Sequence, residues 1–301
     1  MFAAVAALAS ALATIVPATG WQLAAVDGTT VPPSVLHAAA HVEIAVVDTG
    51  ADMSVPVLAA RRPRTYDTRT RTGNVHDANG HGTFVASLAA AFSGDARLLI
   101  VKAGSSRGAF TDDAEAAAIR YAIGHGARIV NLSIGGPETS PVERAAIRFA
   151  VKKGALVVTP AGNNYGMGNP VEYPAALLQP VGSNGAGGTG LVVAAATQSG
   201  GRAPFSGSGS WISLAAPGVD VFGALLGRRY GFGSGTSFAA PQVAGAAALV
   251  WAADPALTAQ GVAQILEQSA SGEGVWSPAL GYGVIDEAAA VGLAQAAFAE
   301  R

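Results

Sequence analysis

The feature that most constrains the fold is a series of short, almost wholly apolar runs rich in Val, Ile and Leu. Polar and apolar residues do not alternate within them, which is typical of strands buried on both faces of a parallel sheet. Ala-rich stretches with helical spacing separate the runs, and this alternation predicts one α/β domain of three layers, a mostly parallel central sheet with helices on both faces. The expected strands are 42–48, 97–102, 128–133, 155–159 and 191–196, and the expected helices are 83–92, 112–125, 141–153, 239–253, 258–269 and 286–299.

The composition is that of a chain with a large core and few charges. Half of the 301 residues are hydrophobic and 13% are charged, which excludes a disordered chain. The formal net charge of −2 gives no reason to expect nucleic acid as a partner. The chain has no cysteine, so disulfides, thiolate metal sites and cysteine nucleophiles are excluded. No motif indicates a metal or a cofactor, and we expect a monomer.

The first 19 residues are apolar and carry no charge. Residues 2–16 have about the length of a signal-peptide core, although no Lys or Arg before Arg61 supplies the usual basic segment. Pro17 ends the run too early for a membrane span, which needs about 20 apolar residues. We interpret residues 1–19 as an export signal, residues 20–301 as a single domain, and the protein as secreted or placed in the cell envelope. The alternatives are a packed N-terminal helix and a start codon assigned too far downstream.

Three further segments resemble binding sites at first inspection. Residues 61–71 contain five arginines without helical spacing, and we interpret them as a solvated surface loop rather than an anion site. Residues 182–190 are rich in glycine but lack the Lys-Ser/Thr of a phosphate-binding loop. His37 and His41 have the spacing of a metal-binding pair on a helix, yet only alanines lie between them, so we predict no metal there.

Three short motifs place reactive side chains at the ends of expected core elements. Asp48 follows a buried strand in VVDTG, His81 precedes a helix in GHGT, and Ser237 begins another helix in GTS. Singly, such an Asp can cap a turn, such a His can be structural and such a Ser can be an N-cap. Together they supply the hydroxyl, the base and the orienting carboxylate that acyl transfer by serine requires. Asn163 adds an amide that can stabilise an oxyanion.

Four stretches resemble the subtilase family of subtilisin-like serine proteases. They are VVDTG at 46–50, GHGTFVASLAA at 80–90, NLSIGGP at 131–137 with PAGNN at 160–164, and GTSFAAPQVAGAAALV at 235–250. Weaker similarity joins them, so the resemblance covers about residues 42–292. It implies a subtilisin-like fold and a serine endopeptidase that acts on protein or peptide substrates without a cofactor.

The resemblance also implies a role for each matching residue. Asp48 would orient His81, His81 would act as base and then as acid, and Ser237 would attack the scissile carbonyl. Asn163 would hold the oxyanion together with the backbone N–H of Ser237. An extended substrate would pair as a strand with two segments, Ser133-Ile134-Gly135 and Ser106-Arg107-Gly108, and its P1 side chain would also contact Ala161 and Gly162.

Two departures from the family pattern concern specificity and metal binding. Glu172 stands where the base of the S1 pocket is expected, and a carboxylate there would favour Lys or Arg at P1. Alternatively, Glu172 is paired with an arginine of the protein or turned to solvent. Residues 89–94 are too few for the calcium-binding loop that many subtilases insert after the catalytic histidine.

Two other functional interpretations stay open. Residues 48–51, Asp-Thr-Gly-Ala, also resemble the active-site turn of retroviral-type aspartic proteases. No second Asp-Thr/Ser-Gly occurs, however, and the helical pattern contradicts that small β fold. The other interpretation is a catalytically silent subtilase fold that serves as a binding module, although all four chemical positions are intact.

Overall fold

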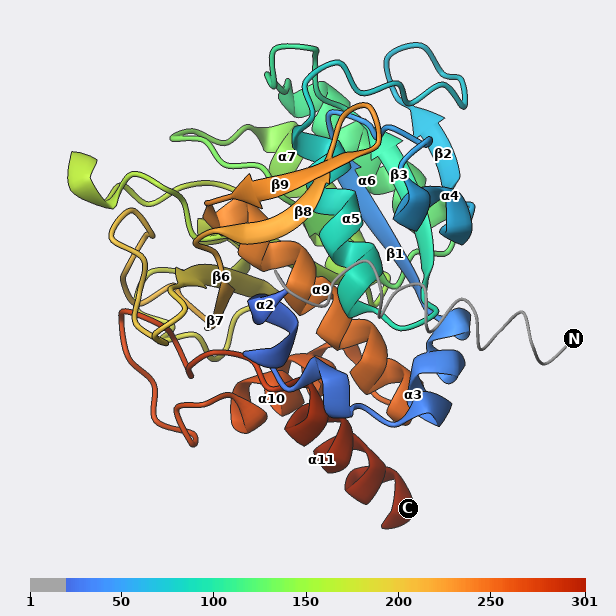
Figure 1. Cartoon of the computed structure of the whole chain (residues 1–301). Helices are drawn as coiled ribbons and strands as arrows, with labels where there is room; N and C mark the ends of the chain where they lie inside the picture. Colours follow the sequence, from blue (N-terminus) through green and yellow to red (C-terminus); the bar gives the residue numbers. More distant parts are fainter. Residues whose placement is uncertain (1–19) are drawn as a thin grey trace, which may run out of the picture.

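The computed structural model describes residues 20–301, which are built around a seven-stranded parallel sheet (Figure 1). The strand order is β2-β3-β1-β4-β5-β6-β7. The strands are β1 (Glu43–Asp48), β2 (Arg64–Asp67), β3 (Arg97–Lys102), β4 (Ile129–Leu132), β5 (Leu156–Pro160), β6 (Leu191–Ala196) and β7 (Leu214–Pro217). A separate antiparallel hairpin consists of β8 (Val221–Leu225) and β9 (Arg229–Gly233).

The central strand β1 shows why these runs carry so few polar residues. All six of its residues are buried, with β3 on one side and β4 on the other. Ile44 and Val46 belong to the core on one face of the sheet, whereas Ala45 and Val47 belong to the core on the other face. Successive side chains point to opposite faces of a strand, so two covered faces require an unbroken apolar run.

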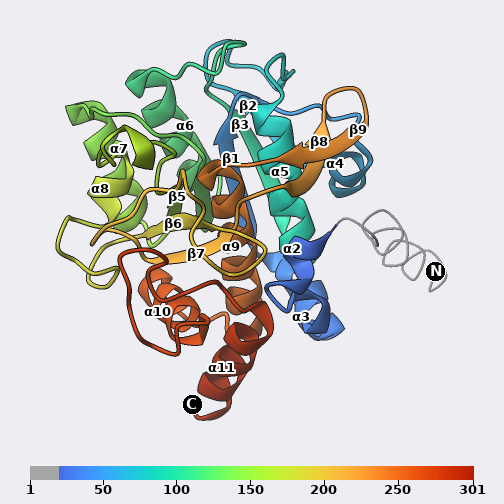
Figure 2. The same ribbon diagram turned by 60° about the vertical axis from the view of Figure 1, so that its left-hand side comes forward.

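Helices cover both faces of the sheet, which confirms the predicted three-layer α/β fold (Figures 1 and 2). One face is covered by α3 (Pro33–Ala38), α4 (Pro56–Arg61), α5 (His81–Phe92), α9 (Thr236–Ala253), α10 (Ala259–Ser269) and α11 (Glu287–Ala299). The other face is covered by α6 (Asp112–Gly124), α7 (Pro141–Lys152) and α8 (Ala175–Leu178). The short helix α2 (Trp21–Ala24) and three 3₁₀ turns complete the chain, at Gly28–Thr30, Ala39–His41 and Tyr165–Met167.

Helices α6 and α7 begin where their capping residues predict. The Thr111 hydroxyl accepts a bond from the N–H of Ala114 at 3.3 Å, and the Ser140 hydroxyl accepts one from the N–H of Glu143 at 3.2 Å. Each cap satisfies a backbone donor that has no partner within the helix. Both caps lie at the sheet edge where the strands end, because each helix follows a parallel strand.

The arginine-rich segment is not the solvated loop that we expected. Helix α4 ends at Arg61, and Arg64–Asp67 form β2, the edge strand that pairs with β3. The Tyr66 ring stacks on that of Tyr121 at 3.6 Å between centroids, so this strand has a packed face despite its charges. The prediction was wrong because the packing partner lies on α6, far away in the sequence.

The N-terminal segment, residues 1–19, which we interpret as an export signal, lies outside the described residues. Within residues 20–301, no helix is both long enough and apolar enough to cross a membrane. His37, whose spacing from His41 raised the question of a metal, instead lies 2.7 Å from an Asp95 carboxylate oxygen.

We expect thermal stability to be independent of calcium. Helix α5 runs without interruption from His81 to Phe92, and β3 begins at Arg97, so no inserted loop separates them. In the part of the chain that the structure describes, no group of three or more His, Asp or Glu residues is arranged to hold a metal ion. A cation that binds only the folded state raises stability according to its concentration and affinity. The melting temperature should therefore be the same in EDTA and in excess calcium, and a drop in EDTA that calcium reverses would contradict this.

Candidate active site

The predicted orienting carboxylate, Asp48, and the predicted base, His81, meet at the edge where the parallel strands end. Asp48 is the last residue of β1 and is fully buried, and His81 is the first residue of α5. The Nδ1 atom of His81 lies 2.8 and 3.0 Å from the two carboxylate oxygens of Asp48. Because Nδ1–H donates to Asp48, the neutral imidazole keeps its lone pair on Nε2, where it can accept a proton.

A second buried carboxylate, Asp77, holds Asp48 and His81 in this arrangement. It was not among the residues predicted from the sequence. Asp77 is 1% exposed. Its oxygens accept hydrogen bonds of 2.6–3.0 Å from the hydroxyls of Thr49 and Thr83 and from the backbone N–H groups of Asn79, Gly80 and Thr83. The Thr49 hydroxyl in turn accepts from the N–H of Gly82 at 2.9 Å. The start of α5 is thus fixed to the residue that follows Asp48.

These carboxylates determine the protonation of His81. Burial alone would lower the pKa of His81. The charge of Asp48, its hydrogen bond to His81 and the charge of Asp77 together raise the pKa by more than burial lowers it. The net result is a pKa above the ordinary value of 6.5. The imidazolium form is therefore stabilised, as acyl transfer requires of a base that must carry a proton between two steps.

Ser237 lies in the first turn of α9, a helix that packs against α5. The ring of its neighbour Phe238 lies 5.6 Å from the His81 ring. Within residues 20–301, the Ser237 hydroxyl makes no hydrogen bond to His81. Such bonds often tighten only when substrate binds. The N-terminal position directs the positive end of the helix dipole toward a group that the hydroxyl attacks.

A proline inside α9 explains how Ser237 is anchored to the sheet. Pro241 has no N–H, so the carbonyl of Ser237, four residues earlier, has no helical donor. The Ser133 hydroxyl donates to that carbonyl instead, at 2.8 Å. The side-chain amide of Asn131 donates to Ser133 Oγ at 2.9 Å and completes the link to β4.

Asn163 has its amide oriented by the helix that carries Ser237. Its Oδ1 accepts from the backbone N–H of Thr236 at 2.9 Å and from the Thr236 hydroxyl at 3.0 Å. Because both donors occupy the oxygen, the amide nitrogen faces away from them. Asn163 is exposed, so this nitrogen can donate to an incoming oxyanion.

The segments expected to bind substrate lie at the same edge of the sheet. Residues 133–135 connect β4 to α7, and residues 106–108 connect β3 to α6. Ser133 and Ile134 are buried, whereas Gly135, Ser106 and Arg107 are exposed. Gly108 and Gly162 have φ angles of +77° and +94°, which only glycine adopts readily. Ala161 is fully buried beside Gly162, just after β5.

Glu172 lies between two of these segments. A Cβ atom added at Gly135 would collide with Oε2 of Glu172, and one added at Gly162 would collide with its carboxyl carbon. Glu172 is 8% exposed, and its Oε1 accepts from the Asn164 side-chain amide at 2.8 Å. It is therefore not turned to solvent, and within residues 20–301 it forms no ion pair with an arginine.

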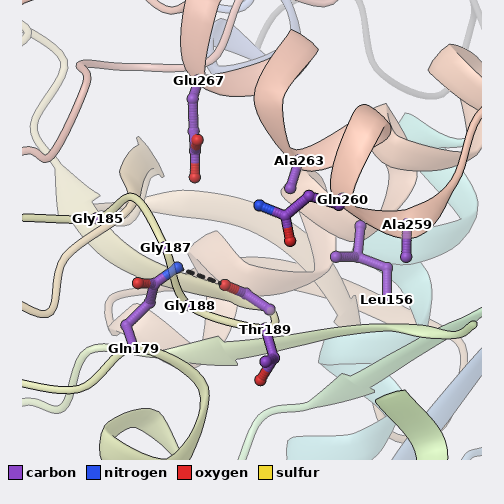
Figure 3. Close-up of a pocket in the computed structure, with 11 residues that line it drawn as sticks. Leu156, Gln179, Gly185, Gly187, Gly188, Thr189, Ala259, Gln260, Ala263 and Glu267 are labelled. Carbon is purple, nitrogen blue, oxygen red and sulfur yellow. Dashed lines mark hydrogen bonds between the residues drawn. The ribbon is translucent and has the colours of Figure 1, made fainter. Parts of the chain in front are cut away.

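Two hollows lie at the opposite edge of the sheet, where the strands begin, and neither is lined by Asp48, His81 or Ser237. The first, of about 10 Å³, has room for a single water beside Gln179 and Glu267 (Figure 3). Burial raises the pKa of Glu267 to about 8. The second, of about 370 Å³, is bordered by eight residues, of which four are arginines, namely Arg61, Arg62, Arg64 and Arg97.

The chain is similar to known proteins both in its sequence and in its fold. The family model described as the subtilase family matches residues 39–283. The chain is 36% identical over 252 residues to the thermophilic serine proteinase of Bacillus sp. (strain AK1), covering 78% of this chain but only 58% of that protein. It is 32% identical to a subtilisin of Bacillus pumilus, covering 78% of this chain and 86% of the relative. The solved structure of MycP3 protease from the type VII (ESX-3) secretion system matches with a TM-score of 0.71 and 28% identity, over 91% of this chain and 88% of that one.

The matched range contains Asp48, His81, Asn163 and Ser237. The family model covers most of the chain, and each of the two sequence relatives covers 78% of it. The chain therefore belongs to the subtilase family.

Proposed function

We propose that this chain is a serine endopeptidase with Asp48, His81 and Ser237 as its catalytic triad. The observation that carries the proposal is the pair of short contacts between His81 Nδ1 and the buried Asp48 carboxylate. His81 Nε2 takes the proton of Ser237 as the hydroxyl attacks the scissile carbonyl. Protonated His81 then gives this proton to the leaving amine, and water hydrolyses the acyl-enzyme by the reverse sequence.

The oxyanion of each tetrahedral intermediate is stabilised by two donors, the Asn163 side-chain amide and the backbone N–H of Ser237. The orientation of Asn163 by Thr236 supports this role, because a donor fixed before the reaction needs no reorganisation as charge develops. Substrate binds as an added strand between residues 106–108 and 133–135. Such pairing uses the peptide backbone and accepts many sequences.

The carboxyl group of Glu172 forms the bottom of the S1 pocket, and the pocket therefore takes Lys or Arg at P1. The carboxylate spans the gap between Gly135 and Gly162 and belongs to no ion pair within residues 20–301. A guanidinium or ammonium group entering this gap forms charge-assisted hydrogen bonds that a neutral side chain lacks.

The natural substrates are proteins or peptides, and the protein acts outside the cytoplasm, in the envelope or in the medium. The uncharged apolar segment at residues 2–16 supports this location. The match to a protease of a secretion system is consistent with it.

We expect a fluorophosphonate probe to label Ser237 and no other serine. Peptide mapping of the labelled protein identifies the modified residue. Ser237→Ala should abolish labelling and lower kcat by about 10⁴- to 10⁶-fold, the scale known for the triad of subtilisin itself. Ser199→Ala, at an exposed loop serine, is the matched control and should retain both the labelling and the kcat of the wild-type protein. A correctly folded wild-type protein that neither reacts nor cleaves peptides would instead be the silent binding module, and inhibition by pepstatin would indicate the aspartic mechanism.

The pH profile should reflect the raised pKa of His81. Only neutral imidazole accepts the serine proton, so kcat/KM falls as the pH decreases through the pKa of the free enzyme. The carboxylates of Asp48 and Asp77 raise this pKa, so the midpoint of the acidic limb should lie above 6.5. A midpoint below that value would show that burial outweighs both carboxylates.

Substitution of Glu172 should change the P1 preference. Wild-type protein should cleave a peptide with Arg at P1 about 10- to 150-fold more efficiently than the same peptide with Phe or Leu. Glu172→Gln keeps the size of the side chain and removes this preference, whereas Glu172→Gly opens the pocket to Phe and Leu. The comparison uses kcat/KM for the three peptides with each variant. A wild-type preference for Phe or Leu that Glu172→Gly leaves unchanged would contradict the assignment.

A further inference from the structure

The larger hollow, at the edge where the strands begin, is lined by four arginines that the proposed proteolytic site does not use. Its volume of about 370 Å³ lies within the range of about 300–1,000 Å³ that is usual for small-molecule sites. Glu43 and His125 lie among the arginines, which are Arg61, Arg62, Arg64 and Arg97. None of these residues belongs to the segments proposed to bind substrate, so the hollow needs an explanation of its own.

The parallel pairing of the strands places two of the arginines on one face of the sheet. Arg97, the first residue of β3, pairs with Glu43, the first residue of β1. Arg64, the first residue of β2, pairs with Leu99, which belongs to the core under α6. Paired residues of neighbouring strands point to the same face, and so do residues two apart in one strand. His125 follows the last residue of α6, so the strand starts and the end of this helix bring the charges together.

Two of the arginines are held in place by contacts within the protein. Arg64 donates from Nε to Oε1 of Glu43 at 3.0 Å, contacts Oε2 of Glu43 through Nη2, and donates to the carbonyl of His125 at 2.6 Å. Arg61 donates to a backbone carbonyl of α5 at 2.7 Å and lies 3.7 Å from an oxygen of Asp95. Guanidinium groups fixed in this way lose little further freedom when a ligand binds.

The other two arginines, Arg62 and Arg97, are exposed and form no ion pair within residues 20–301. Arg62 directly follows α4 and has a φ angle of +49°, a left-handed conformation that helices more often give to glycine at this position. The chain thus has an arginine at a position where glycine would be less strained.

Positive charge is in excess around the hollow. Two carboxylates, Glu43 and Asp95, pair with Arg64 and Arg61, which leaves two of the four guanidinium groups without a negative partner in the part of the chain that the structure describes. Burial lowers the pKa of Arg61, and the charge of Asp95 opposes this shift only in part. A concave surface of one sign concentrates ions of the opposite sign. The hollow therefore has the charge and the shape of an anion site.

We propose that this hollow binds a soluble di- or triphosphate compound at the edge of the sheet opposite the proteolytic site. A phosphate group has several terminal oxygens, which can accept from different guanidinium groups at once, whereas a carboxylate has one planar pair of oxygens. Two linked phosphate groups match the two uncompensated charges and fill more of the hollow than one group does. The inference does not depend on the proposed function, because it involves neither the triad nor the substrate segments.

Calorimetry of the full chain with inorganic pyrophosphate and tripolyphosphate measures this binding directly. The ionic strength is kept at about 0.1 M, where charges more than about 10 Å away are largely screened. Wild-type protein should bind both compounds, and more tightly than citrate, which carries its charge on carboxylates. Arg62→Gln combined with Arg97→Gln should weaken the binding of pyrophosphate by about tenfold or more, because charge-assisted hydrogen bonds are lost.

Arg69→Gln combined with Arg71→Gln is the matched control. Both residues are exposed and belong to the same arginine-rich segment, but neither lines the hollow, so the double variant loses the same charge and should bind as wild type does. The melting temperature gives a second readout. Pyrophosphate should raise it for the wild type and the control by more than sodium sulfate of equal ionic strength does, and should not do so for the variant of Arg62 and Arg97.

Three results would overturn the proposal. Unchanged binding in the variant of Arg62 and Arg97, or equal weakening in both double variants, would show that pyrophosphate binds elsewhere or responds only to overall charge. Binding of citrate as tight as that of pyrophosphate would show that the hollow does not select phosphate. Sedimentation with vesicles of phosphatidic acid, without binding of soluble pyrophosphate, would identify a lipid headgroup as the ligand instead.

Discussion

The arrangement of Asp48 and His81, at the edge where the strands end, depends on Asp77. The residues of the proposed triad come from three elements distant in the sequence, so their side chains need hydrogen bonds between those elements to be held in place. Asp77 accepts bonds from both sides of the gap between β1 and α5, through Thr49 on one side and Thr83 on the other. Each bond to a charged acceptor contributes about 1.5–3 kcal/mol. Their directions fix the start of α5, and with it His81, against the end of β1.

Ser237 is also held by hydrogen bonds from another part of the chain, at a point where its own helix lacks one backbone hydrogen bond. Pro241 leaves one carbonyl of α9 without its helical donor, and Ser133 of the substrate segment occupies that position. Ser237, the proposed nucleophile, is thereby joined to the segment that is proposed to bind the substrate strand. A shift of that segment would move the attacking hydroxyl and the scissile bond together, so their relative position depends little on motions of the sheet as a whole. Thr236 does the same for the oxyanion donor, because it orients Asn163 from the residue next to Ser237.

The core could be predicted from the sequence because its signals are local. Strands β1, β3 and β6 are continuous apolar runs, and their predicted bounds agree with the structure to within one residue. Strands β2 and β7 and the β8–β9 hairpin were missed. Arg64–Asp67 are mostly polar, β7 is only four residues long and ends in proline, and the hairpin is rich in glycine. Of the site, Asp48, His81, Asn163 and Ser237 occur in motifs that are recognisable in the sequence. Asp77 lies four residues before His81, outside the quoted motif, and its partners Thr49 and Thr83 become neighbours only in the folded chain.

The buried carboxyl group of Glu172 gives the proposed S1 pocket a means of rejecting substrates as well as binding them. Glu172 is 8% exposed, and it belongs to no ion pair within residues 20–301. A neutral side chain that covers such a carboxylate removes its remaining water and offers no donor in return. Leaving a charged group unpaired in this way costs more than the loss of one ordinary hydrogen bond. A site built to pair a charge therefore discriminates more strongly than an apolar pocket, in which one methylene changes the binding free energy by about 1–3 kcal/mol. The selectivity of this edge thus comes mainly from the penalty on neutral side chains, although the backbone pairing beside it accepts any sequence.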